Sequence, residues 1–326
     1  MSLLEVRDLH VWFDLPEGEQ LHAVRGVSFD LDAGERTGLV GESGCGKTTI
    51  VLSLLGLLPP SATVAGDVRF EGESILSEAE ESMQPHRWTD ISMVFQGAMN
   101  ALNPVKTVEA QIVEPMVLHG TSEGAEARRR AGDLLEMVGI PAATGSRYPH
   151  EFSGGMRQRA ALAMALACEP KVLLADEPTT ALDVMVQAQI LELLVSLARD
   201  LDLALVLVTH DLPVVAQVCE RASVMYAGEI VETGPMDALF HTPRHPYTRL
   251  LFAATPGLHE EDDVVSIPGT PPRLDREIVG CPFQPRCDRA FDRCRVERPV
   301  LKPLDEVRRA ACHLNDEWAG VGREGR

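Results

Sequence analysis

The feature that most constrains this chain is a glycine-rich sequence at residues 41–48, Gly-Glu-Ser-Gly-Cys-Gly-Lys-Thr. Apolar runs at 37–40 and 49–55 flank it, as expected for a strand, a turn and a helix. In this arrangement backbone N–H groups and the helix N-terminus bind phosphate, the lysine contacts the outer phosphates, and the threonine hydroxyl binds Mg²⁺. An ordinary glycine-rich turn would not explain the flanking elements. The predicted nucleoside triphosphate site comprises Gly41, Glu42, Ser43, Gly44, Cys45, Gly46, Lys47, Thr48 and Thr49.

Composition narrows the classes of protein that remain. The chain has 326 residues, which suggests two domains or one domain with an appendage. Its net charge of −19 disfavours nucleic acid as a partner. No stretch reaches the about 18 uninterrupted apolar residues of a membrane span. The N-terminal residues lack the basic and apolar regions of a secretion signal, so we expect a cytosolic location.

Two carboxylates end an apolar run at 172–175, and we expect this run to be a buried strand. Beside a phosphate loop, Asp176 fits a Mg²⁺ partner and Glu177 fits a general base that orients the attacking water. Gln96 follows another apolar run at 91–95 and could contact Mg²⁺ or that water; a solvated loop glutamine is the alternative. His210 follows a third run at 203–208. A histidine after a strand usually has a structural role, but its place at the C-terminal edge of this strand, where α/β ligand sites lie, favours a γ-phosphate contact.

Ser153, Gly154 and Gly155 form a second predicted phosphate site, with an N-cap hydroxyl and free backbone N–H groups at the start of a helix. They lie within a helical region that extends from about 105 to 168. Residues 180–183, ending in Asp183, are expected to cap a helix at 184–200.

Near the N-terminus, short strands are predicted at 4–6 and 10–13, followed by an alternation of apolar and polar residues at 24–31. Either Trp12 or Phe13 could stack on an adenine base; an aromatic residue filling a sheet face is equally consistent with the sequence. Further predictions are a helix stop at residues 59–60, an antiparallel pair near 66–70 and 75, and a hairpin across 227–228.

Four of the seven cysteines lie together, at Cys281, Cys287, Cys294 and Cys312. In a reducing compartment such a cluster indicates a metal site rather than disulfides. Four thiolates fit a [4Fe–4S] cluster or tetrahedral Zn²⁺, and the paired C-x₂-C sequences of common zinc sites are absent. Four unligated thiols in a flexible tail are the remaining alternative. The prolines at 282, 285 and 299 disfavour it, because they make the segment rigid.

In their order, these motifs resemble the ATP-binding subunit of ABC transporters over roughly residues 3–250. The resemblance implies an α/β fold: a P-loop, RecA-like core with an antiparallel β subdomain and an inserted helical subdomain at about 97–168. It also implies that Phe13 stacks on adenine, that Gln96 couples nucleotide state to the membrane partner, and that Glu177 and His210 are catalytic. Asp183 corresponds to the D-loop residue, and Thr48, Gln96 and Asp176 to the Mg²⁺ ligands. Phe152 and Met156 depart from the usual Leu-Ser-Gly-Gly-Gln signature, whose Ser-Gly-Gly core is intact.

Beyond the core, residues 268–272 and the cysteines resemble the small irregular C-terminal extension of oligopeptide, dipeptide and nickel importer ATPases. Some members of that branch hold an iron–sulfur site there, which favours [4Fe–4S] over Zn²⁺. The boundary between the nucleotide-binding domain, 1–255, and the extension, 256–326, is expected near Thr255. The resemblance implies ATP-powered import of di- or oligopeptides; import of nickel or another small solute, or a non-transport ABC ATPase, are alternatives.

The single motif set implies partners. Ser153, Gly154 and Gly155 are expected to contact ATP held by a second ABC ATPase subunit, a related, non-identical chain. Two separate permease subunits would span the membrane, with a solute-binding protein acting indirectly, and the chain would lie at the cytoplasmic face as a peripheral subunit. A translation or DNA-repair ABC protein would carry two motif sets or a coiled-coil insertion, an exporter would lack the cysteine-bearing tail, and a P-loop kinase would lack Ser-Gly-Gly.

Overall fold

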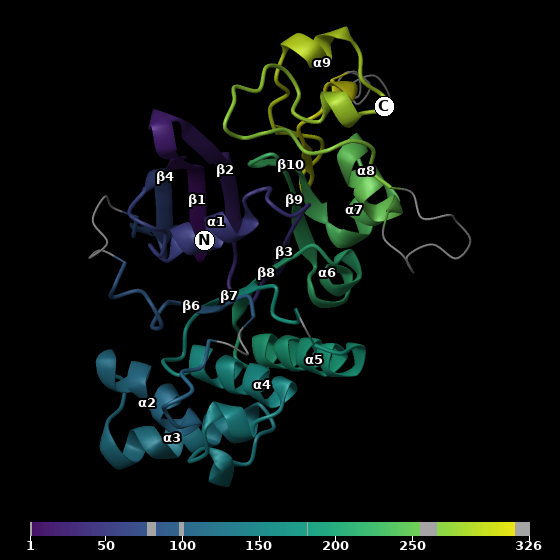
Figure 1. Ribbon diagram of the computed structural model, residues 1–326. Helices are drawn as coiled ribbons and strands as arrows, with labels where there is room; N and C mark the ends of the chain where they lie inside the picture. Colours follow the sequence, from purple (N-terminus) through teal and green to yellow (C-terminus); the bar gives the residue numbers. More distant parts are fainter. Residues whose placement is uncertain (1, 77–82, 98–100, 181, 255–265, 317–326) are drawn as a thin grey trace. The chain divides into compact units, whose positions relative to one another are not determined.

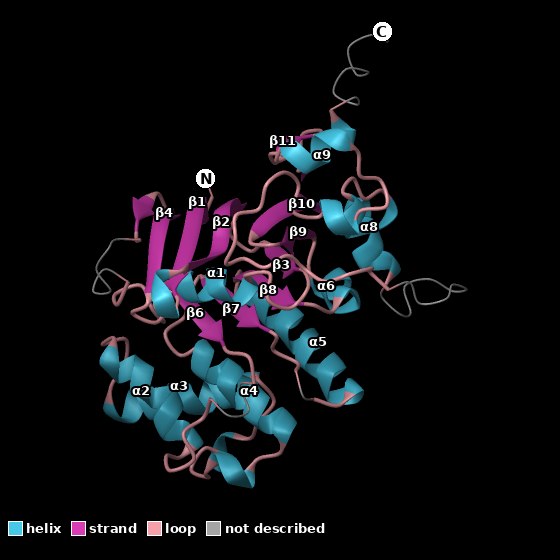
Figure 2. Ribbon diagram, turned by 45° about the horizontal axis from the view of Figure 1, so that its top comes forward, coloured by secondary structure: helices cyan, strands magenta, loops and turns pink. Residues whose placement is uncertain are grey.

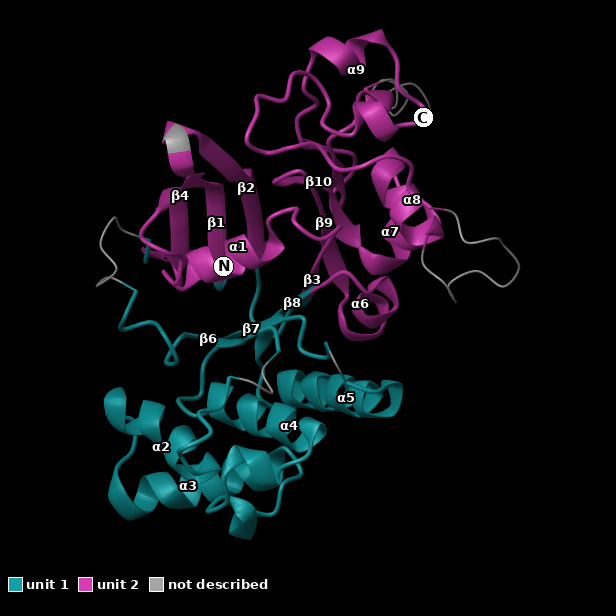
Figure 3. Cartoon of the chain, in the orientation of Figure 1, with its two compact units in different colours: residues 1–3, 31–36, 75–208 teal, residues 4–30, 37–74, 209–326 magenta. Residues whose placement is uncertain are grey.

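A computed structural model describes residues 2–76, 83–97, 101–180, 182–254 and 266–316 (Figure 1). The chain forms two compact units, each assembled from separate stretches of sequence (Figure 3). Unit 1 comprises residues 1–3, 31–36 and 75–208, and unit 2 comprises residues 4–30, 37–74 and 209–326. The predicted boundary at Thr255 lies outside the described residues, so the division at 255 stays a prediction.

Unit 1 contains three parallel strands that pair side by side. They are β6 (Ile91–Val94), β7 (Val172–Asp176) and β8 (Ala204–Thr209), with β7 in the middle. Every residue of the three strands is buried. Such continuous apolar strands are typical of parallel sheets covered on both faces, as the sequence predicts.

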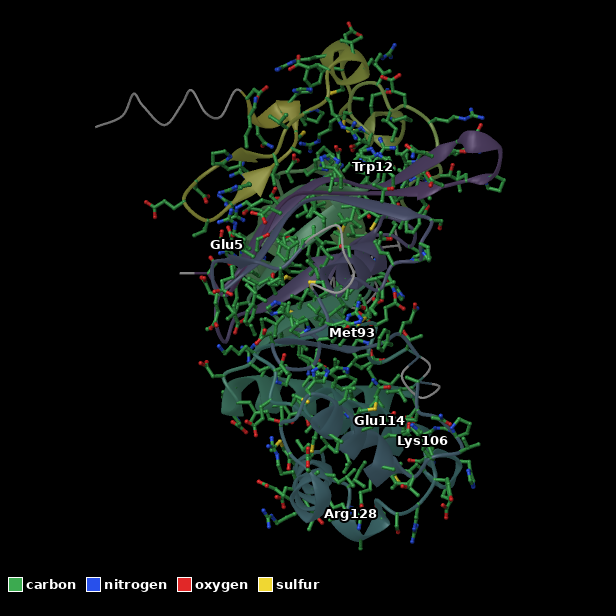
Figure 4. The ribbon with its side chains drawn as sticks, turned by 90° about the vertical axis from the view of Figure 1, so that its left-hand side faces the viewer. Glu5, Trp12, Met93, Lys106, Glu114 and Arg128 are labelled. Carbon is green, nitrogen blue, oxygen red and sulfur yellow. The ribbon has the colours of Figure 1, made fainter. Side chains whose placement is uncertain are left out.

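Helices make up the rest of unit 1. They are α2 (Val108–Leu118), α3 (Gly124–Met137), α4 (Gly154–Ala165) and α5 (Val184–Asp200), with short 3₁₀ turns at Ala142–Thr144 and Pro149–Glu151. Helices α2, α3 and α4 pack on one another. Buried residues recur every four positions on α3, at Ala127, Ala131 and Leu135, so one stripe of this polar helix faces its neighbours. On α2, both carboxylate oxygens of Glu114 accept a hydrogen bond from the Lys106 ammonium, at 2.9 and 2.7 Å (Figure 4).

An antiparallel sheet in unit 2 has the strand order β2-β1-β4-β5 (Figure 2). Its strands are β1 (Leu4–Asp14), β2 (Gln20–Leu31), β4 (Ala62–Phe70) and β5 (Glu73–Ser74), and a 3₁₀ turn at Pro16–Gly18 joins the first two. The prediction of separate strands at 4–6 and 10–13 is wrong, because β1 is continuous. Asp8 has a φ of 48°, and the pairing register shifts between Arg7 and His10. At this bulge the buried side chains change from even-numbered to odd-numbered positions. In the sequence, this change of alternation looks like a gap between two strands.

A second group of paired strands in unit 2 includes β3 (Arg36–Val40), which is parallel to β9 (Arg221–Tyr226). Strand β10 (Glu229–Pro235) forms the predicted hairpin with β9. The extension adds two short strands to the edge of β10, β12 (Arg309–Ala310) and then β11 (Lys302–Pro303). The extension is therefore hydrogen-bonded to the sheet that precedes the glycine-rich loop.

Short helices complete unit 2. They are α1 (Lys47–Leu54), α6 (Leu212–Val218), α7 (Met236–His241), α8 (Pro246–Ala253) and α9 (Asp292–Val296), with 3₁₀ turns at Gln284–Arg286 and His313–Asn315. Helix α1 ends before the predicted stop at residues 59–60, because Gly56 has a left-handed φ of 59°. No helix in the described part of the chain is long and apolar enough to cross a membrane.

Candidate nucleotide site

The glycine-rich loop of unit 2 connects β3 to α1, as the sequence predicts. Gly46 occupies the N-cap of α1 with a φ of 106°, and a Cβ atom there would lie 2.7 Å from the carbonyl oxygen of Ala23. Glycine is therefore required on both conformational and steric grounds. Ser43, Gly44 and Thr48 are exposed, so the loop presents backbone and hydroxyl groups to solvent at a helix N-terminus.

Lys47 folds back over this loop. Its Nζ donates to the carbonyl oxygens of Gly41, at 2.7 Å, and Glu42, at 3.1 Å, and the residue is 7 % exposed. Cys45 is buried beneath it, with Sγ 3.8 Å from Nζ. Burial raises the pKa of the Cys45 thiol, so the thiol is neutral and serves as a small apolar filler. The ammonium is thus held beside the exposed loop, where it can exchange carbonyl partners for phosphate oxygens.

A second set of predicted site residues meets in unit 1, at the ends of β6 and β7. Gln96 donates from Nε2 to Glu177 Oε2 at 2.8 Å, and Thr180 Oγ1 donates to the same oxygen at 3.0 Å. The Glu177 N–H donates to the carbonyl oxygen of Val208 at 2.8 Å, and its φ is 43°, rare for a residue with a side chain. Asp176, at the last position of β7, is 1 % exposed. The structure therefore brings Gln96 and Glu177 into direct contact.

The Ser-Gly-Gly sequence begins α4. Ser153 is exposed and its Oγ accepts a hydrogen bond from the Met156 N–H at 3.3 Å, as a helix cap does. A Cβ atom at Gly155 would lie 2.7 Å from Cγ1 of Val186 on α5, so this glycine also permits close helix packing. Phe152 is buried. Its position therefore needs an apolar side chain, which phenylalanine provides as the leucine of the usual signature does.

The remaining predicted site residues are Asp183, His210, Trp12 and Phe13. Asp183 caps α5, as predicted, accepting a hydrogen bond from the Val186 N–H at 3.0 Å; the neighbouring Ala181 lies outside the described residues. His210 is exposed directly after β8. Trp12 stacks on His22 with ring centroids 4.6 Å apart, whereas Phe13 points to the opposite face of β1 and is half-buried. None of these contacts tests the predicted roles toward nucleotide.

The four clustered cysteines line one cavity, together with His245, Phe283 and His313. All seven cysteines are described and none forms a disulfide. Burial, with a smaller contribution from the neighbouring cysteines, raises the pKa of the Cys281 thiol to about 11 and that of the Cys312 thiol to about 12. Within the described residues, no group of three or more His, Cys, Asp or Glu side chains is arranged to hold a metal ion. The expectation of a metal site is therefore not supported by the side-chain arrangement.

Sequence reasoning missed two residues that contact the glycine-rich loop. Arg286, between two of the cysteines, forms an ion pair with Glu42, and the Tyr247 hydroxyl accepts a hydrogen bond from the Glu42 N–H. A buried arginine far along the chain carries no local signal, because its partner is 244 residues away.

Comparisons with known proteins agree with this geometry. Residues 24–180 match the family model described as ABC transporter, and residues 231–294 match the one described as oligopeptide/dipeptide transporter, C-terminal region. The oligopeptide transport ATP-binding protein OppD of Escherichia coli is 46 % identical, covering 95 % of this chain and 93 % of its own. The dipeptide transport ATP-binding protein DppD of the same organism is 44 % identical, with 98 % and 99 % covered.

Among solved structures, the dimeric ATP-binding cassette MJ0796, bound to ADP and Pi in a post-hydrolysis state, is similar with a TM-score of 0.63. It is 28 % identical and covers 72 % of this chain and 98 % of its own length. The expected cassette fold is confirmed by this similarity.

Proposed function

Since the chain belongs to the family of ABC transporter ATP-binding proteins, we propose that it hydrolyses ATP to power the import of di- or oligopeptides through a separate permease. Relatives named for oligopeptide and dipeptide transport are 44–46 % identical over nearly the full length, and this is the observation that carries the cargo class. Import of nickel or another small solute is the second candidate. The ATPase subunit does not contact the cargo, so its own residues do not distinguish peptides from other solutes.

Lys47 and the glycine-rich loop bind the phosphates in this proposal. The Lys47 ammonium leaves the carbonyl oxygens that it contacts at 2.7 and 3.1 Å and donates to the outer phosphates. Phe13 stacks on the adenine. Mg²⁺ would be held by Thr48, Gln96 and Asp176, whose hydroxyl, amide and carboxylate oxygens are the donors that Mg²⁺ prefers. When bound, the ion neutralises charge on the phosphates.

Glu177 is the proposed general base. Hydrogen bonds from Gln96 and Thr180 fix the orientation of its carboxylate, and its left-handed backbone is of the kind that concentrates at functional sites. An oriented carboxylate can accept a proton from the water that attacks the γ-phosphate. His210 contributes a γ-phosphate contact, and Gln96 relays nucleotide state to the permease.

The partner assignments rest on the family and on the single motif set. We propose that Ser153, Gly154, Gly155 and Asp183 serve ATP bound by a second, related ATPase subunit, so that ATP joins the two nucleotide-binding domains. Two permease subunits and, indirectly, a solute-binding protein complete the importer, with this chain at the cytoplasmic face. The domain division at 255 belongs to the same proposal.

Uptake measurements test the function. Cells lacking this chain should lose uptake of labelled di- or tripeptide, and wild-type protein should restore it, whereas Lys47→Ala should not. Uptake of radioactive nickel in the same cells distinguishes the second candidate. Normal peptide uptake in the deletion strain, with nickel uptake lost, would replace the peptide assignment.

We also propose that the four clustered cysteines bind a [4Fe–4S] cluster. They line one cavity, and a cluster binds each thiolate to a different iron, so its ligands are spaced more widely than those of a single ion. A structural Zn²⁺ is the alternative. His313 is excluded as a ligand through Nε2, which lies 2.9 Å from the carbonyl oxygen of Glu297.

Anaerobic purification followed by iron, sulfide and zinc analysis separates these possibilities. About four irons with broad visible absorbance is the expected result. One zinc without colour would replace the cluster by a structural zinc site, and protein without metal would refute both. The Cys168→Ser variant, which changes a buried cysteine outside the cluster, is the matched control and should retain the metal.

A further inference from the structure

A buried ion pair joins the cysteine-bearing extension to the glycine-rich loop, within unit 2. Arg286 Nη1 lies 2.6 Å from Glu42 Oε2, and Nη2 lies 2.9 Å from Oε1. The pair is therefore bidentate, the strongest geometry for an arginine and a carboxylate. The Arg286 side chain is 4 % exposed and that of Glu42 is 25 % exposed, so solvent screens this pair less than a surface pair.

Arg286 is itself fixed by two further contacts. Its Nε donates to the Pro268 carbonyl oxygen at 2.7 Å, and Nη1 donates to the Tyr226 hydroxyl at 3.3 Å. The guanidinium carbon also lies 5.7 Å from the centroid of the Tyr226 ring. The hydrogen bonds to Glu42 and Tyr226 raise the pKa of Arg286, so it stays charged throughout the accessible pH range. A fixed positive charge thus faces Glu42.

Glu42 is also held through its backbone. Its N–H donates to the Tyr247 hydroxyl at 2.9 Å, and Tyr247, at the start of α8, is fully buried against Phe283 with ring centroids 5.3 Å apart. Both contacts thus reach Glu42 from elements beyond residue 245. The conformation of the loop at Glu42 depends on these elements.

The charge at Glu42 matters because of its place in the loop. It directly precedes Ser43 and Gly44, two exposed residues of the loop. An uncompensated carboxylate at this position would repel the phosphates of ATP. We propose that Arg286 is a positioning residue, which neutralises and fixes Glu42 so that the loop can accept an anionic nucleotide. This inference rests on the proposed ATP binding and makes nucleotide affinity depend on the extension.

A second-site rescue tests the proposal in the full-length protein. The Arg286→Gln variant should bind MgATP roughly 10-fold more weakly than wild type, because Glu42 is then unneutralised. The defect should shrink at high salt, where the repulsion is screened. Adding Glu42→Gln should restore affinity to within about 3-fold of wild type, since the repelling charge is gone. A merely structural role for Arg286 predicts neither the salt dependence nor the rescue.

The matched control is Arg249→Gln, which removes another ion pair between α8 and the extension, at 2.6 Å from Asp288, without touching the loop. It should bind MgATP as wild type does. Wild-type affinity in Arg286→Gln, or equal weakness of the single and double variants, would overturn the proposal. If Arg286→Gln does not fold, Arg286→Lys decides, because lysine keeps the positive charge that neutralises Glu42. This variant should bind MgATP within about 3-fold of wild type, and a loss of about 10-fold would overturn the proposal. Failure of wild-type protein to bind MgATP would instead refute the proposed function.

Discussion

At the scale of single residues, Glu177 is held by hydrogen bonds to both its side chain and its main chain. Two donors, Gln96 and Thr180, contact its Oε2, and its main chain has a positive φ of 43°. A left-handed conformation in a residue with a side chain has an energetic cost that surrounding contacts must offset. Here the hydrogen bond from its N–H to Val208 fixes the turn after β7. The carboxylate is thereby oriented by groups of the protein itself.

We predict that Glu177→Gln retains ATP binding but hydrolyses ATP about 10²–10⁴-fold more slowly, because an amide cannot accept the proton from water. Hydrolysis by the assembled transporter and nucleotide affinity of the isolated chain are the two measurements. The control is Glu192→Gln, on the exposed side of α5, which should hydrolyse ATP at the normal rate. A wild-type rate in Glu177→Gln would remove this residue from the role of general base.

At the scale of elements, the start of α8 depends on two buried polar side chains. Glu232 Oε1 and Oε2 accept hydrogen bonds from the N–H groups of Arg244 and His245, at 2.7 and 2.8 Å. His245 Nδ1 in turn accepts a hydrogen bond from the Tyr247 N–H at 3.0 Å. These contacts satisfy backbone donors that the helix itself leaves unpaired. They also place Tyr247, which contacts the glycine-rich loop.

The His245 cap predicts an acid-sensitive helix. Burial lowers the pKa of His245 from 6.5 to about 3, so the folded state keeps the imidazole neutral while the unfolded chain binds a proton. Its stabilising contribution is complete above pH 6.5 and is lost as the pH falls toward 3, with about 3 kcal/mol lost by pH 4. Melting temperatures of wild type and His245→Gln should differ most at pH 7.5 and converge at pH 4.5. A constant difference would contradict the prediction.

At the scale of the whole molecule, the predicted site residues are divided between two compact units. Lys47 and Thr48 belong to unit 2, while Gln96, Asp176, Glu177 and the helix beginning after Ser153 belong to unit 1. The chain carries one copy of each motif. Ser153 is exposed at the start of α4. The N–H groups in the first turn of this helix can donate hydrogen bonds to an anion of another molecule.

A substitution at this helix start tests pairing. The Ser153→Arg variant should keep the ATP affinity of the isolated chain but abolish hydrolysis in the complex, because the bulky cation blocks the partner's nucleotide. Thr107→Arg removes an equivalent cap from α2, where Thr107 Oγ1 accepts a hydrogen bond from the Ala110 N–H, and should leave hydrolysis intact. If ATP affinity and hydrolysis fall together in Ser153→Arg, Ser153 acts within its own chain.

Local sequence signals predicted most of the elements. The helix at Val184–Asp200 and the hairpin across Ala227 and Gly228 lie where the periodicity indicated, since helix caps, turn residues and hydrophobic alternation act over a few residues. The errors have local causes too. The bulge at Asp8 concealed the continuity of β1, and Gly56 ended α1 earlier than the proline pair suggested.

The sequence alone determined the phosphate loop, the carboxylates at the end of β7 and the capped start of α4, because each depends on residue types at fixed spacing. Only the tertiary structure decided which of these side chains meet. It joined Gln96 to Glu177 across 81 residues of sequence and Arg286 to Glu42 across 244. It also showed that β12 pairs with β10, so that the extension continues the sheet on which the loop is built. Such contacts depend on strand order and packing between distant segments, which no local pattern encodes.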